Sequence, residues 1–154
     1  MDLKRLIANN SDNMDSIVSI AKEKYTVLGR NLSLAILAEY PRYNDLKSDQ
    51  FDKIGVVPIF RKLVQAKICS NINIALLSEK LKIIPANLIP FVRERMQGHE
   101  CRFDYVGVGG FFAVKTGENS ENTLVDIISE AMVTKRVNIV VGEIALLGEG
   151  WNPA

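Results

Sequence analysis

The sequence has few of the residues that mark specialised classes of protein. Only two of its 154 residues are cysteines, Cys69 and Cys101, and they follow no metal-ligand spacing. No apolar run reaches the roughly 18 residues of a membrane-spanning helix, and the apolar part of the N-terminal segment is too short for a secretory signal. We therefore expect a cytoplasmic protein with reduced thiols, no metal site and no membrane partner.

An excess of charge of either sign is also missing. The chain has 19 Lys and Arg against 18 Asp and Glu, which gives a formal net charge of +1. This balance gives no excess of positive charge that would indicate nucleic-acid binding. It argues against binding by the chain alone, but not against a groove shared with another domain. The length and a hydrophobic share of 47% predict one globular domain over residues 1–154.

The motifs of ATP hydrolysis are absent. The sequence contains no Walker A pattern and no Asp-Glu-x-His box. In nucleotide-hydrolysing motors these segments supply the phosphate-cradling loop, the magnesium site and the carboxylate that activates water. We therefore identify no catalytic residue and no metal ligand, and we expect this chain alone to be inactive as an ATPase and to bind neither ATP nor magnesium.

Helical and strand patterns alternate along the chain. Apolar residues at helical spacing predict helices over 12–29, 57–68, 88–96 and 124–131. Short apolar runs predict strands near 32–38, 81–84, 103–108, 111–114 and 137–141. Residues 1–11 are interpreted as a flexible N-terminal segment and residues 42–53 as a surface loop. The alternation predicts an α/β fold, a three-layer αβα domain with a mostly parallel sheet.

Two short motifs have alternative interpretations. Gly107-Val-Gly-Gly precedes a β-prone segment rather than a helix, which favours a hairpin turn over a dinucleotide-binding loop. Lys115, Thr116 and Gly117 lie where a strand gives way to a helix, a place where α/β sheets bind phosphate. A simple capped turn explains these residues equally well, with Asn119 or Ser120 as the cap, and both interpretations stay open.

The C-terminal segment carries the most specific pattern. It reads Asn138-Ile-Val-Val-Gly-Glu-Ile-Ala-Leu-Leu-Gly-Glu-Gly-Trp-Asn-Pro-Ala, which resembles motif V of superfamily-two DEAD/DEAH-type helicases, in the branch similar to type III restriction enzymes. In that motif a strand of the second motor domain leads into a glycine-rich loop. Gly148 and Gly150 would let backbone N–H groups approach a phosphate. The resemblance implies that Gly148, Gly150 and Asn152 face the nucleotide cleft.

Earlier segments resemble the same family in the same order. They begin with 14–22 and 34–42 and continue with 54–63, 81–86 and 116–119. The resemblance therefore implies a RecA-like domain of the P-loop NTPase type, truncated after motif V. The full-length parent would use ATP and magnesium, contact DNA or RNA through residues such as Lys115, Thr116 and Gly117, and contain a further N-terminal RecA-like lobe. Because the chain would be cut, we expect the tail from about Leu146 to be poorly ordered or held by a neighbouring molecule.

The sequence departs from the family pattern at two positions. Glu143 stands where the family has Thr, and Asn152 stands where it has Asp. The arginine-rich motif VI is missing as well. We therefore consider two functions. One is the second motor lobe of an ATP-dependent helicase or translocase, such as one of the restriction-modification type. The other is a non-enzymatic α/β scaffold or interaction domain that keeps only the fold.

Overall fold

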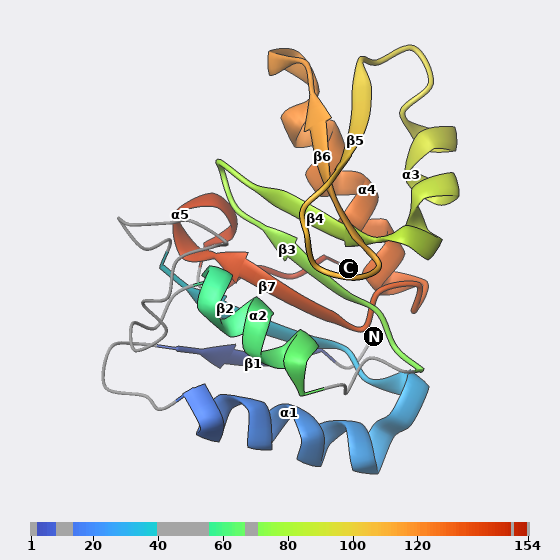
Figure 1. Ribbon diagram of the computed structural model, residues 1–154. Helices are drawn as coiled ribbons and strands as arrows, with labels where there is room; N and C mark the ends of the chain where they lie inside the picture. The colour runs from blue at the N-terminus through green and yellow to red at the C-terminus, as the bar shows by residue number, and fades with distance from the viewer. Residues whose placement is uncertain (1–2, 9–13, 40–55, 67–70, 149, 154) are drawn as a thin grey trace.

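Seven strands form a single sheet in the computed structural model, which describes residues 3–8, 14–39, 56–66, 71–148 and 150–153 (Figure 1). Five α-helices accompany the sheet, with three short 3-10 turns, η1, η2 and η3. In chain order the elements are β1 (Lys4–Ile7), α1 (Met14–Leu28), η1 (Gly29–Asn31), β2 (Leu34–Ala38), α2 (Val56–Gln65), β3 (Ile74–Leu77), β4 (Lys82–Pro85), η2 (Ala86–Leu88), α3 (Ile89–Arg95), β5 (Cys101–Tyr105), β6 (Phe111–Thr116), η3 (Glu118–Ser120), α4 (Glu121–Val133), β7 (Ile139–Glu143) and α5 (Ile144–Leu147).

The sheet has a parallel half and an antiparallel half. Its strand order is β1-β2-β7-β3-β4-β6-β5. The pairs from β1 to β3 are parallel, and the pairs from β3 to β5 are antiparallel. Strands β3 and β4 are joined by only four residues, 78–81, which is too short for the crossover that a parallel pair needs.

Helices cover both faces of this sheet, so the predicted three-layer α/β fold is confirmed (Figure 1). Helices α1 and α2 pack on one face and share a core with alternate residues of β2, β3 and β7. Helices α3 and α4 pack on the other face, against the intervening strand residues. Central strands buried on both faces explain why β2 and β7 are continuous apolar runs.

Most predicted elements are found close to their expected bounds. In α4, Leu124, Ile127, Ile128 and Ala131 are buried at the spacing that predicted the helix. The glycines at 107 and 110 have positive φ and lie in the loop between the antiparallel strands β5 and β6, which confirms the hairpin. The predicted surface loop over 42–53 lies outside the described residues.

Three predictions need correction. Lys4–Ile7, placed in a flexible segment, form edge strand β1 and pair in parallel with β2. Strand β3 was not predicted at all. The described part of the C-terminal tail is packed, because Leu146, Leu147 and Trp151 contact the core beneath α3 and α4. A hydrogen bond of 2.8 Å from Arg5 Nε to the Trp151 carbonyl also ties this tail to β1.

Candidate functional site

Both segments singled out in the sequence lie at the same edge of the sheet. Strands β6 and β7 run in the same direction, so Thr116 at the end of β6 and Glu143 at the end of β7 are at the carboxyl edge. Ligands of α/β sheets bind preferentially at this edge. Strands β3 and β4 separate the two ends, which places them about 14 Å apart at the usual strand spacing. The structure therefore places the ends of β6 and β7 at one edge of the sheet without joining them into one cluster.

The turn after β6 is closed by the backbone. The Ser120 N–H donates to the Gly117 carbonyl at 3.0 Å, and no side-chain cap bonds the start of α4. The Ser120 hydroxyl is instead 2.8 Å from His99 Nδ1. Lys115 is exposed, but Glu100 Oε2 is 3.4 Å from the place where a Cβ on Gly117 would stand. A carboxylate beside this turn opposes an anion there, whereas the positive charge of Lys115 favours one.

The C-terminal segment begins with a tight turn. A Cβ on Gly142 would stand 2.3 Å from Leu147 Cδ1 and 3.3 Å from Leu37 Cδ2, so a larger residue there requires the Leu147 side chain to move. Gly148 then adopts a φ of +83°, and its N–H donates to the Ile144 carbonyl at 2.7 Å. Among the described residues, no atom outside the adjacent residues lies within 4 Å of the Cβ position of Gly148 or Gly150. The described part of the chain thus leaves space beside these two glycines, while Asn152 is exposed.

Glu143 is turned away from this open space. Its side chain is buried, and Oε1 accepts a hydrogen bond of 2.7 Å from the Glu79 N–H in the turn between β3 and β4. The neighbouring Lys82 is also buried, and its Nζ lies 3.4 Å from the Glu79 carbonyl. Burial lowers the pKa of Lys82, although the carboxylates of Glu121, Glu143 and Glu79 act in the opposite direction.

Comparison with protein-family models, with curated proteins and with solved structures gave no match. Function must therefore be inferred from the residues and their geometry. None of the described helices is long and apolar enough to cross a membrane. The described residues also contain no group of three or more His, Cys, Asp or Glu side chains that could hold a metal ion.

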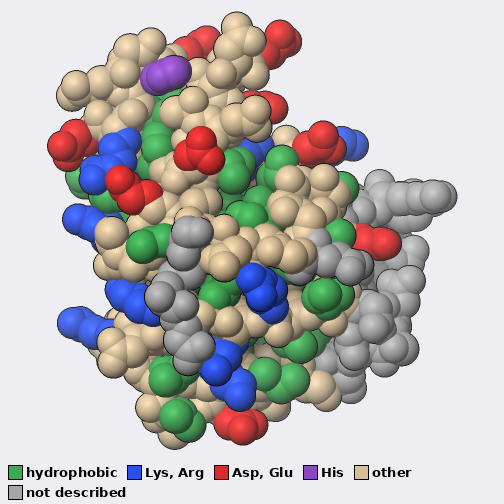
Figure 2. Space-filling model, turned by 180° about the vertical axis from the view of Figure 1, so that it is seen from behind, with side chains coloured by type: hydrophobic (Ala, Val, Ile, Leu, Met, Phe, Trp, Pro, Cys, Tyr) green, Lys and Arg blue, Asp and Glu red, His purple; other side chains and the backbone are tan. Residues whose placement is uncertain are grey.

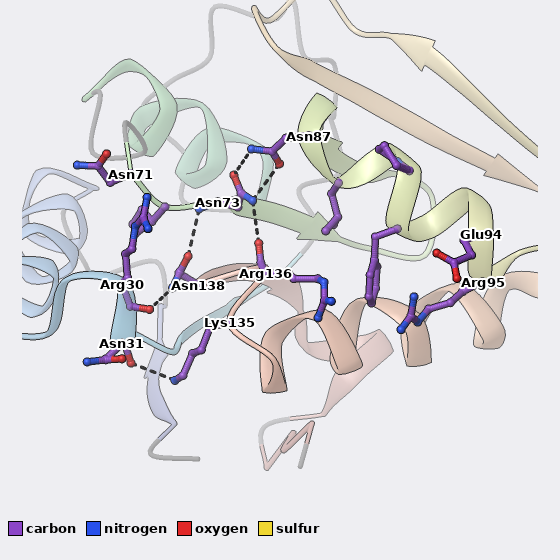
Figure 3. Close-up of a pocket in the computed structure, with 14 residues that line it drawn as sticks. Arg30, Asn31, Asn71, Asn73, Asn87, Glu94, Arg95, Lys135, Arg136 and Asn138 are labelled. Carbon is purple, nitrogen blue, oxygen red and sulfur yellow. Dashed lines mark hydrogen bonds between the residues drawn. The ribbon is translucent and has the colours of Figure 1, made fainter.

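A pocket of about 950 Å³ lies at the opposite, amino edge of the parallel strands (Figure 3). Its walls come from η1, the segments that lead into β3 and β7, η2, and one side of α3. Ten of its fourteen lining residues are charged or carry an amide: Arg30, Asn31, Asn71, Asn73, Asn87, Glu94, Arg95, Lys135, Arg136 and Asn138.

Asparagine side chains form a hydrogen-bond network beneath this pocket. Asn138 is buried and donates through Nδ2 to the carbonyls of Arg30 at 2.9 Å and Leu32 at 3.0 Å. Its Oδ1 accepts from the Asn73 N–H at 3.3 Å. Asn73 Nδ2 in turn donates to the Arg136 carbonyl at 2.7 Å. The network therefore links the backbones of Arg30 and Arg136, as Figure 3 shows.

A second amide pair completes the network. Asn73 and Asn87 bond reciprocally through their side chains, at 2.9 and 3.1 Å. This pair joins the start of β3 to η2, and so holds α3 against the same pocket. These residues were not among the site residues predicted from the sequence. Asparagines do stand directly before the apolar runs of β3 and β7, and this pattern could have suggested a polar site.

Proposed function

We propose that this chain is a RecA-like second motor lobe of an ATP-dependent helicase or translocase, which contributes to a nucleotide cleft and contacts nucleic-acid phosphates. The observation that carries the proposal is the position of β7. This strand lies between β2 and β3 in the parallel half of the sheet and ends at the carboxyl edge. Gly148 follows β7 after the short helix α5, so in this proposal the glycine-rich segment faces the edge at which α/β sheets bind ligands.

The open backbone at Gly148 and Gly150 fits a nucleotide phosphate. No described atom outside the adjacent residues lies within 4 Å of the Cβ position of either glycine, so in this proposal a phosphate oxygen reaches the backbone there. When bound, ATP with magnesium supplies the phosphoryl group whose transfer drives such motors. The described residues offer no cluster of acidic ligands for magnesium, so in this proposal the metal ligands belong to the N-terminal lobe.

A scaffold without motor activity is the second candidate, and Glu143 favours it. The carboxylate stands where the family pattern has Thr and is engaged with the Glu79 N–H. A side chain held in this way stabilises the turn between β3 and β4 and offers no hydroxyl to a phosphate. In the scaffold function, the carboxyl edge keeps its fold and has no affinity for nucleic acid.

Binding of labelled single-stranded DNA and RNA at low and moderate salt separates the two functions. A motor lobe binds both nucleic acids weakly and less tightly at the higher salt, because phosphate contacts release counterions. Replacing Lys115 with Gln weakens this binding, whereas the matched change Lys22→Gln on α1 leaves it unchanged. Absence of binding, or equal binding by both variants, would favour the scaffold. Phosphate release from ATP by the chain alone is expected to stay at the buffer rate in either case.

A further inference from the structure

We propose that the pocket at the amino edge is a binding site for a phosphate-bearing ligand, held by Arg30 and Arg136. This site is separate from the carboxyl edge and does not depend on the motor function proposed above. We call it the amino-edge pocket and define it by the fourteen lining residues, of which Arg30, Arg95, Lys135 and Arg136 are cationic.

The charge of the chain is concentrated here. The lining contains four cations and one carboxylate, Glu94, so its formal charge is +3 although the whole chain carries only +1. Figure 2 shows that Lys and Arg side chains gather over the middle and lower part of the back face, whereas most Asp and Glu side chains lie towards its upper end. A hollow lined by one sign of charge focuses the field and attracts ions of the opposite sign.

Three of the four cations lack a carboxylate partner in the described part of the chain. Arg95 is ion-paired with Glu130, but no described residue forms an ion pair with Arg30, Lys135 or Arg136. The guanidinium of Arg136 lies over the Phe91 ring, 4.6 Å from its centroid, and Arg95 lies over the same ring at 3.8 Å. Two cations brought to one ring repel each other, and a bound anion would relieve that repulsion.

The backbones of the two arginines are fixed before any ligand arrives. The hydrogen bonds of Asn138 and Asn73 run without interruption from the Arg30 carbonyl to the Arg136 carbonyl. Asn138 is buried, and three hydrogen bonds use its amide. An ordered backbone beneath both guanidinium groups lowers the entropy that binding would otherwise cost.

Lys135 lies at the rim of the amino-edge pocket and has a strained backbone conformation. Its φ of +64° belongs to the left-handed region, which disfavours residues with a Cβ. The following N–H, of Arg136, donates to the Ala131 carbonyl at 2.8 Å and closes the end of α4 in the manner usually served by glycine. Lysine at this position brings a charge to the rim, where Nζ donates to the Asn31 carbonyl at 3.0 Å and also to the Ser33 hydroxyl.

Phosphate fits these groups better than other anions do. Guanidinium groups present planar pairs of N–H donors that match two phosphate oxygens. A net charge of +3 suits an anion of more than one charge, and the volume of about 950 Å³ exceeds what a lone carboxylate fills. Only Ile72, Leu88, Pro90 and Phe91 are apolar among the lining residues, so the pocket is not a groove for an apolar peptide.

The test uses inorganic pyrophosphate, ATP and a labelled single-stranded oligonucleotide as probes, with affinities measured by calorimetry or anisotropy. The variant Arg30→Gln/Arg136→Gln removes two charges and leaves a shorter, neutral polar side chain at each position. Lys22→Gln/Lys24→Gln on α1 removes the same charge outside the pocket. Circular dichroism and thermal unfolding of each variant check that the fold is kept. The single variant Arg30→Gln serves if the double variant unfolds, because the exposed Arg30 side chain forms no hydrogen bond or ion pair with a described residue.

We expect pyrophosphate to bind, and the arginine variant to weaken it by about tenfold or more while the lysine control changes it less than about twofold. Tighter binding of ATP identifies a nucleotide as the source of the phosphate, and tighter binding of the oligonucleotide identifies a nucleic-acid backbone. The proposal is overturned if none of the three probes binds at millimolar concentration, if both variants weaken binding equally, or if an acidic peptide binds through the two arginines while pyrophosphate does not.

Discussion

Glu143 accepts a hydrogen bond of 2.7 Å from the backbone N–H of Glu79, across the turn between β3 and β4. Glu143 ends β7, and Glu79 follows β3, the strand paired with it. The carboxylate thus connects the motif V segment to the neighbouring strand. A threonine side chain is too short to serve as the same bridge without movement of the backbone, so in the proposed motor lobe Glu143 would act differently from the threonine of the family pattern.

Replacement of Glu143 by Ala is expected to lower the free energy of unfolding by about 1–3 kcal/mol, because the Glu79 N–H loses its acceptor. Glu143→Gln keeps a carbonyl oxygen at the same reach and is expected to cost less. Urea denaturation of both variants measures the difference. Equal stability of the Ala variant and the wild type would show that the hydrogen bond contributes nothing.

Gly142→Ala is expected to destabilise the fold by about 1–3 kcal/mol, because the new Cβ would collide with the Leu147 side chain. Leu147→Ala in the same chain removes the colliding methyl groups, so the double variant should be more stable than the sum of the two single changes predicts. Gly109→Ala is the matched control, since its Cβ would meet no atom within 4 Å and its φ is not positive. Additive effects at 142 and 147 would contradict the packing described for this turn.

Lys82 makes stability depend on pH in alkaline solution. Burial holds the pKa of its ammonium group below the ordinary lysine value of about 10.4. Between the two pKa values the unfolded chain binds more protons than the folded chain, so this residue makes the free energy of unfolding rise with pH.

Lys82→Met removes this contribution. The unfolding free energy of the wild type should therefore rise relative to that of the Met variant as the pH increases from about 8 to about 10. The value for the Met variant minus the value for the wild type accordingly becomes smaller. Denaturation series of both proteins at several pH values measure it, and other titrating groups cancel in the difference. A difference that stays constant or widens with pH would show that burial does not govern this lysine.

Helices α1 to α4 and strands β2 and β7 could be predicted because their patterns are local. The buried face of α4 repeats at helical spacing, the run of β2 is apolar throughout, and that of β7 is apolar up to Glu143. Strand β1 could not be found in this way. Its two basic residues, Lys4 and Arg5, suit an exposed edge, and only pairing with β2 makes the segment a strand.

The candidate sites also differ in whether a local sequence pattern could reveal them. The glycine-rich segment after β7 is contiguous in sequence, so it could be recognised before the structure. The amino-edge pocket joins residues from 30 to 138, and Asn73 meets Asn138 only because β3 and β7 are neighbours in the sheet. Strand order of this kind is set by tertiary packing, which no local pattern reports. The antiparallel orientation of β4 could not be predicted either. It follows from the short connection between β3 and β4, and β3 had not been predicted.

Photochemical cross-linking to a single-stranded oligonucleotide carrying iodouracil, followed by peptide mapping, tests the carboxyl-edge assignment most directly. The motor-lobe proposal predicts cross-linked peptides that contain Lys115–Gly117 or the segment that follows β7, at positions 144–153. Unlabelled oligonucleotide should compete for them, and added salt should reduce them. Cross-links confined to the amino-edge pocket, around Arg30 and Arg136, would support the second site and contradict the assignment of nucleic acid to the carboxyl edge. Absence of specific cross-links in both regions would contradict the motor-lobe proposal altogether.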